Sequence, residues 1–188
     1  MPFNLPILIT WLRILMIPML VCVYYLPPEW IAEHNKNLAA ALIFSLAAIT
    51  DWLDGYLARR RQQVTTLGQF MDPLADKLLI TAALVSLVQM NLAQSWMVVV
   101  ILGREIAVTV LRSLAQARGI AIPASPLGKF KMVSQVTAIL LLILGEEHVP
   151  QFVALGKIAL WIAMLTAVGS AFDYYRRFNH VLTDDSRL

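Results

Sequence analysis

Apolar residues fall into six long runs along the chain, and polar or charged segments separate these runs. We predict one helix from each, near residues 5–26, 37–60, 70–90, 94–117, 127–145 and 150–177. A helix needs about 20 apolar residues to cross the hydrocarbon core of a bilayer. Some uninterrupted runs are shorter, as in "LLITAALVSLVQM", so these helices either use their polar ends to complete the crossing or are re-entrant. The pattern predicts an all-α protein with six transmembrane helices in a single integral membrane domain, residues 1–188.

Composition agrees with a membrane location. Hydrophobic residues make up 59% of the chain and charged residues only 14%, which is outside the usual range of soluble domains. The single cysteine, Cys22, excludes an intrachain disulfide and a cysteine metal cluster. A net charge of +3 could attract nucleic acid to a soluble protein, but the basic residues here gather in particular loops. We therefore expect contact with membrane lipid and no nucleic-acid partner.

Basic residues also predict how the helices are oriented. The loops after the first, third and fifth apolar runs hold a single lysine, Lys36, within "PPEWIAEHNK", "NLAQS" and "EEHVPQ". The opposite side collects Arg59, Arg60, Arg61, Arg118, Lys129, Lys131, Arg176, Arg177 and Arg187. Because Lys and Arg accumulate on the cytoplasmic side of a membrane, we expect both termini to be cytoplasmic. Since no transit-like leader is visible, a bacterial cytoplasmic membrane is the simplest location.

Four aspartates stand within or beside the apolar runs. Asp51 and Asp54 are three residues apart in the second predicted helix, and Asp72 and Asp76 are four apart in the third. At these spacings each pair shares one face of its helix. The short polar turn "QQVTTLGQF" makes the two helices neighbours, so the two faces can meet. We predict that the four carboxylates point into one cavity near the cytoplasmic surface, about 12 Å below Arg59 at the level of Asp51.

The charge of these carboxylates must be neutralised. An ionisable side chain within a membrane helix costs about 2.5 to 3.5 kcal/mol, and clustered like charges also repel one another. Protonation, ion pairs with Arg59 or Lys77, and divalent cations are the alternatives. Oxygen-only ligands suit hard ions such as Mg²⁺ or Mn²⁺, and two such ions can clamp both oxygens of a phosphoryl displacement. Two spaced pairs fit a metal site better than they fit structural ion pairs.

The residues Asp51-x2-Asp54-Gly55-x2-Ala58-Arg59-x8-Gly68-x3-Asp72-x3-Asp76 resemble the signature of the CDP-alcohol phosphotransferases. The resemblance implies six transmembrane helices, a homodimer, and a cytoplasmic-face site for a CDP-linked lipid with two divalent ions. It assigns metal binding to Asp51, Asp54, Asp72 and Asp76. It assigns nucleotide binding to Asp51, Asp54, Gly55, Ala58, Arg59 and Gly68. Asp76 would also be the general base that accepts the proton of the acceptor hydroxyl.

Three further segments, "FNLPILITWLRILMIP", "GREIAVTVLRS" and "LGKFKMVSQ", resemble the phosphatidylglycerophosphate synthase branch of that family. This branch implies transfer of the phosphatidyl group of CDP-diacylglycerol to glycerol 3-phosphate. The acceptor phosphate would bind Arg112, Lys129 and Lys131, which loop charge alone would make ordinary orienting residues. Inositol phosphate, serine or phosphatidylglycerol remain alternative acceptors. A cation transporter is a further alternative, but its usual sign, an internal repeat, is not evident.

Arg104 and Glu105 are adjacent opposite charges within the fourth predicted helix. Neighbouring helix positions diverge by about 100°, so these two side chains face different helices instead of each other. Arg104 could reach toward the aspartates, or Glu105 could pair with a basic group elsewhere. We expect both residues to support the structure or the site, not to take part in the reaction.

Overall fold

The computed structural model describes residues 5–27, 29–61, 66–117, 126–147 and 149–185. Within these ranges the regular structure is entirely α-helical: α1 Leu5–Tyr25, α2 Glu33–Arg61, α3 Thr66–Gln89, α4 Ser95–Ala117, α5 Pro126–Glu147 and α6 Pro150–Asp185. The description of side chains leaves out residues 5–9, 33–34, 51–61, 66–70, 72, 116–117, 126–129, 147 and 177–185. The predicted all-α class and the six predicted helices are confirmed over the described ranges.

Three helix boundaries differ from the prediction. α2 begins at Glu33, so Lys36, which we expected in a loop, lies in the helix and is buried. α3 begins at Thr66, so Gly68 lies in a helix and not in the polar turn. α6 continues to Asp185, past the predicted end at residue 177. Apolar runs underestimate the length of these helices because the helical backbone continues through the polar residues at their ends.

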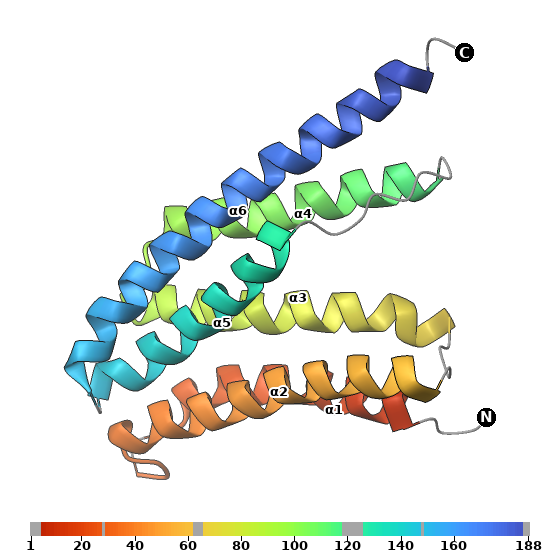
Figure 1. Cartoon of the computed structure of the whole chain (residues 1–188). Helices are drawn as coiled ribbons and strands as arrows, with labels where there is room; N and C mark the ends of the chain where they lie inside the picture. The colour runs from red at the N-terminus through yellow and green to blue at the C-terminus, as the bar shows by residue number, and fades with distance from the viewer. Residues whose placement is uncertain (1–4, 28, 62–65, 118–125, 148, 186–188) are drawn as a thin grey trace.

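The helices form two groups that diverge toward one end of the molecule (Figure 1). α1 packs on α2 and α3, while α5 and α6 pack against each other along their lengths and α4 lies along α6. α3 contacts α4 and α5, and α2 contacts α5, so these contacts join the two groups. The first described residue of α1 and the last of α6 lie at the end where α2 finishes and α3 begins (Figure 1). Both described ends of the chain are therefore on one side of the bundle, as the loop charges predict.

Two glycines bring α5 and α6 into close contact. A Cβ atom on Gly145 would lie 2.6 Å from the backbone nitrogen of Val153, and one on Gly156 would lie 2.8 Å from Cγ of Leu142. Both distances are shorter than an ordinary van der Waals contact, so a larger residue needs the helices to separate. Small residues at contacts of this kind are common between membrane helices.

The outer surface of the described helices is strongly apolar. Large exposed side chains occur on several helices, for example Leu15 on α1, Val99 on α4 and Leu165 on α6. Soluble monomers rarely expose so much apolar surface, whereas lipid tails solvate it well. Such a surface fits a membrane protein.

Among the described residues, one helix segment is long and apolar enough to cross a bilayer by itself, Pro150–Arg176 in α6. Two shorter apolar helical segments are Thr10–Tyr25 and Asn35–Thr50. Charged residues such as Asp76 in α3 and Arg104 in α4 shorten the uninterrupted apolar windows of those helices. The six-span topology is therefore not established by length and apolarity, and it stays a prediction.

Candidate active site

The backbone places the four predicted aspartates on two helices that touch. Asp51 and Asp54 belong to the last turns of α2, and Asp72 and Asp76 to the first turns of α3. α2 and α3 contact each other, and each aspartate pair keeps the helical spacing that puts it on one face. Most of the predicted site residues have side chains that the structure does not describe: Asp51, Asp54, Gly55, Ala58, Arg59, Gly68, Asp72 and Lys129. Convergence of the carboxylates and the nucleotide contacts therefore stay predictions.

Asp76 is the one predicted metal ligand whose side chain the structure describes. It is half-buried on α3, next to the fully buried Ala75. It lies within electrostatic range of the ammonium group of Lys131 on α5. The next residue, Lys77, donates a hydrogen bond from Nζ to Oγ1 of Thr109 on α4. α3 therefore meets α4 at Lys77, whereas the cation within electrostatic range of Asp76 is Lys131 on α5.

Lys131 is buried and forms an ion pair with Glu105. Its side chain is only 7% exposed, and its Nζ donates to Oε1 of Glu105 on α4. A buried charge requires a partner of opposite charge, because desolvation is otherwise uncompensated. Of the two alternatives left open for Arg104 and Glu105, the pairing of Glu105 with a basic group elsewhere is the one observed. Burial within α5 also distinguishes Lys131 from a basic loop residue that only orients the chain.

Arg104 faces a different helix from its neighbour Glu105. Its Nε donates to the backbone oxygen of Ala167 at 3.1 Å, and its Nη2 donates to Oγ of Ser170, both on α6. The alternative in which Arg104 reaches toward the aspartates is thus not the observed arrangement. These two hydrogen bonds connect α4 to α6, and the divergence of adjacent helix positions explains why the two charges separate.

Arg112 is exposed on α4, and its guanidinium carbon lies 5.9 Å from the ring centroid of Tyr174 on α6. A cation over an aromatic face is attracted by the negative face of the ring. The structure records no direct contact between Arg112 and Lys131 among its described interactions. Arg112 and Lys131 each lie within electrostatic range of Arg104. The two predicted acceptor-binding cations are therefore in the same region of the molecule.

Glu105, Thr109 and Arg112 share one face of α4, and we call this set the α4 polar stripe. Each member contacts a different neighbouring helix: Glu105 contacts α5, Thr109 contacts α3 and Arg112 contacts α6. Thr109 was missed from the sequence, although its position four residues after Glu105 is a detectable helical spacing. Ser170 carries no comparable signal, since it becomes relevant only through the packing of α6 on α4.

The described side chains can bind an anion and can accept a proton. Lys77, Lys131 and Arg112 supply positive charge, and the carboxylate of Asp76 is a possible base. Among the described side chains no group of three or more potential metal ligands occurs. Three of the four predicted ligands lie outside that set, and the donor set itself, four carboxylates, matches the preference of a hard divalent cation.

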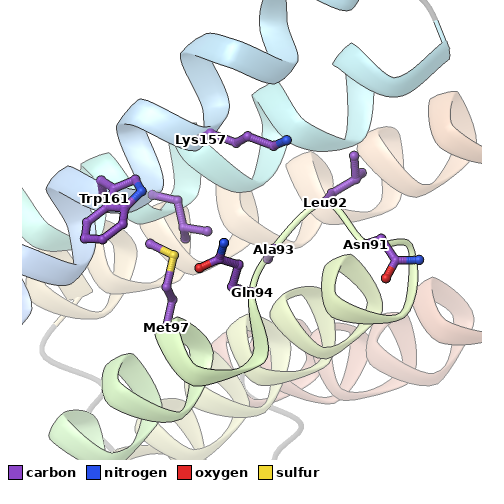
Figure 2. Close-up of a pocket in the computed structure, with 8 residues that line it drawn as sticks. Asn91, Leu92, Ala93, Gln94, Met97, Lys157 and Trp161 are labelled. Carbon is purple, nitrogen blue, oxygen red and sulfur yellow. The ribbon is translucent and has the colours of Figure 1, made fainter.

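A small pocket is present at the other end of α3, which lies about 20 Å along the helix axis from the level of Asp76. Its cavity volume is about 150 Å³. Figure 2 shows its lining residues on the turn between α3 and α4, on the start of α4 and on α6, with Lys157 as a cationic group. Its lining residues lie beyond the end of α3, whereas Asp76 lies toward the start of that helix, so the pocket is separate from the predicted reaction site.

The structure thus shows an all-helical protein with aspartates at helical spacing on two touching helices, an arrangement that fits an enzyme acting on a phosphate ester. The sequence profile of the CDP-alcohol phosphatidyltransferase family matches residues 3–169, and the chain belongs to this family.

Individual relatives match over nearly the whole chain. A CDP-diacylglycerol--glycerol-3-phosphate 3-phosphatidyltransferase of Bacillus subtilis is 41% identical, with 93% of this chain and 95% of the relative covered. A Pseudomonas fluorescens protein of the same name is 40% identical over 96% of this chain and 93% of its own. One from Haemophilus influenzae is 35% identical over the full length of both. The resemblance to this family that the signature indicates is confirmed.

Proposed function

We propose that this protein transfers the phosphatidyl group of CDP-diacylglycerol to glycerol 3-phosphate, which produces phosphatidylglycerophosphate and CMP. The observation that carries the proposal is that the half-buried carboxylate of Asp76 lies within electrostatic range of the buried ammonium of Lys131. A base and a phosphate-binding cation are the two groups that a phosphorylated alcohol requires. The relatives that match over nearly their full length are named for the same reaction.

The chemistry is a single displacement at phosphorus. The acceptor hydroxyl oxygen forms a bond to the phosphorus of the phosphatidyl group, the bond from that phosphorus to the CMP oxygen breaks, and CMP leaves. Asp76 accepts the hydroxyl proton as the new bond forms. Positioning and charge neutralisation dominate reactions of this type, so no covalent enzyme intermediate is needed.

The acceptor phosphate carries about two negative charges near neutral pH. We propose that Arg112, Lys129 and Lys131 bind it. The ammonium of Lys131 is a compact point charge, whereas the planar guanidinium of Arg112 can donate two parallel hydrogen bonds. Arg112 lies on α4 and Lys131 on α5, whereas the four aspartates lie on α2 and α3. We propose that the acceptor approaches from α4 and α5 and the donor lipid from α2 and α3.

Divalent metal ions are general in this family. We propose Mg²⁺ or Mn²⁺, as two ions, and the residues that would hold them are Asp51, Asp54, Asp72 and Asp76. When bound, such ions neutralise the pyrophosphate of the lipid donor and stabilise charge on the leaving CMP. The residues proposed to contact the cytidine nucleotide are Asp51, Asp54, Gly55, Ala58, Arg59 and Gly68.

We also propose that the protein is a homodimer in the bacterial cytoplasmic membrane, with six spans and with both termini and the site on the cytoplasmic side. The apolar outer surface and the concentration of basic residues near one end support this placement. The position of the described chain ends on one side of the bundle supports an even number of crossings (Figure 1).

Purified protein with CDP-diacylglycerol and Mg²⁺ or Mn²⁺ tests the proposal. Glycerol 3-phosphate, serine, inositol phosphate and phosphatidylglycerol are supplied separately, and CMP release is measured. We expect release with glycerol 3-phosphate, loss of release after chelation with EDTA, and recovery when the metal is restored. Release only with another acceptor would contradict the acceptor assignment. No release with any of them would contradict the enzyme assignment.

A further inference from the structure

We propose that Glu105 is a positioning residue, which holds the Lys131 ammonium in the place where it binds the phosphate of the acceptor. This inference rests on the proposed function, because it concerns the same acceptor site. Glu105 has no direct role in the displacement: it acts through Lys131, with which it forms the ion pair between α4 and α5.

The burial of the pair explains why Lys131 needs this partner. A lysine side chain has a flexible four-carbon stem, and an exposed ammonium samples many positions. Here the Lys131 side chain is 7% exposed and that of Glu105 is 17% exposed, so the ammonium has few routes to water. Glu105 supplies one strong acceptor, and the remaining N–H groups of Lys131 are available to a phosphate oxygen.

A second chain of hydrogen bonds reaches Glu105 from α3. Nζ of Lys77 donates to Oγ1 of Thr109, and Oγ1 of Thr109 donates to the backbone oxygen of Glu105 at 2.7 Å. One turn of α4 therefore holds an ammonium from α5 through the Glu105 side chain and an ammonium from α3 through Thr109. Asp76 directly precedes Lys77 and also lies within electrostatic range of Lys131. The α4 polar stripe thus holds the Lys131 ammonium within electrostatic range of Asp76, where our proposal places the acceptor phosphate.

The charge of Glu105 has a second consequence for the site. It offsets part of the positive charge of Lys131, so the acceptor phosphate binds through directed hydrogen bonds more than through excess charge. Without the Glu105 carboxylate, the site would keep the Lys131 ammonium, but that group would no longer be held in one orientation. We therefore expect Glu105 to control acceptor affinity without controlling the affinity for CDP-diacylglycerol.

Steady-state kinetics of Glu105→Gln test this inference. Glutamine has nearly the same shape, but it carries no charge to hold the ammonium. We expect the KM for glycerol 3-phosphate to rise about tenfold, with kcat and the KM for CDP-diacylglycerol within about twofold of the wild type. Protection of the protein against thermal unfolding by glycerol 3-phosphate, in the absence of CDP-diacylglycerol, should weaken in parallel.

Two further variants separate positioning from a general structural role. Glu105→Asp keeps the charge but shortens the side chain, so a smaller rise in KM is expected, and this variant tests the inference even if Glu105→Gln fails to fold. In a Lys131→Met background, Glu105→Gln should raise the KM no further, because the group that it positions is already absent. Additive effects of the two substitutions would contradict the inference.

Glu146→Gln is the matched control. Glu146 accepts a hydrogen bond from Nδ2 of Asn37 at 2.9 Å, near the other end of α5, and glutamine can still accept it. All kinetic constants of this variant should match the wild type. An unchanged or lowered KM for glycerol 3-phosphate in Glu105→Gln, with normal wild-type turnover, overturns the positioning role alone. Absence of wild-type turnover with glycerol 3-phosphate overturns the proposed function and this inference together.

Discussion

At the scale of single residues, the surroundings of Asp76 are the most informative feature of the site. Its carboxylate is half-buried, which removes part of its hydration, and it lies close to the positive charge of Lys131. We propose that this carboxylate is the base that accepts the proton of the incoming phosphorylated alcohol. The same residue belongs to the proposed metal ligands, so binding and proton transfer must be separated experimentally.

Asp76→Asn makes that separation. The carboxamide keeps an oxygen that can bind a cation but cannot accept the hydroxyl proton. We expect binding of CDP-diacylglycerol in the presence of Mg²⁺ or Mn²⁺ to persist, as measured by calorimetry. Turnover should fall by about 10² to 10⁴, the usual contribution of a general base.

The control for this substitution is Glu29→Gln, which makes the same chemical change at an exposed residue between α1 and α2. Its turnover should equal that of the wild type. Turnover of Asp76→Asn close to the wild-type value would show that another group accepts the proton.

At the scale of elements, two kinds of contact between helices hold the structure together. The α4 polar stripe connects α4 to three other helices through polar contacts, whereas α5 and α6 contact each other through small residues. Polar contacts position charged groups of the site. Close packing of α5 on α6 sets the position of the helix that carries Lys131.

Gly145→Ala tests the importance of that close packing. The added Cβ would lie 2.6 Å from the backbone nitrogen of Val153, and a backbone atom cannot rotate away. We expect a loss of stability of about 1 to 3 kcal/mol, the usual cost of overpacking, seen as a lower Tm in detergent. Gly169→Ala is the matched control, because nothing lies within 4 Å of the added atom. The Tm of this control should stay the same or rise slightly, since alanine favours helix formation. Equal Tm values for Gly145→Ala and Gly169→Ala would contradict a tight α5–α6 contact.

At the scale of the whole molecule, the arrangement of the chain predicts which residues face each side of the membrane. The ends of the described chain and the start of α3 lie at one end, and the turn between α3 and α4 lies at the other (Figure 1). α2 ends at Arg61 on the former side, which we propose is the cytoplasmic one.

Cysteine labelling in intact cells tests this orientation. Cys22 is exposed and would itself react, so the labelling variants are made in the Cys22→Ser protein. Gln94→Cys, at the turn between α3 and α4, should react with a membrane-impermeant maleimide in intact cells. Arg176→Cys, an exposed position toward the end of α6, should react only after the membrane is permeabilised. The reverse pattern would invert the proposed topology.

Much of the fold was predictable because the signals for it are local. Apolar runs located the helices, and helical spacing placed Asp51 with Asp54 and Asp72 with Asp76. The ends of helices were less predictable: α2 begins earlier and α6 ends later than the apolar runs, because a helix continues through polar residues without any change in hydrophobicity. The family signature also lies within one short stretch, so it needed no tertiary information.

The sequence by itself thus determined the helices, the aspartate spacing and the family, all of which depend on residues close together in the chain. Only the tertiary structure decided that Glu105 pairs with Lys131, 26 residues later, and that Arg104 contacts Ser170, 66 residues later. Helical periodicity predicted that Arg104 and Glu105 face different neighbours, but it contains no information about which helix lies on each side. That choice depends on how whole helices pack, because burial of a charge becomes favourable only where another helix brings its partner.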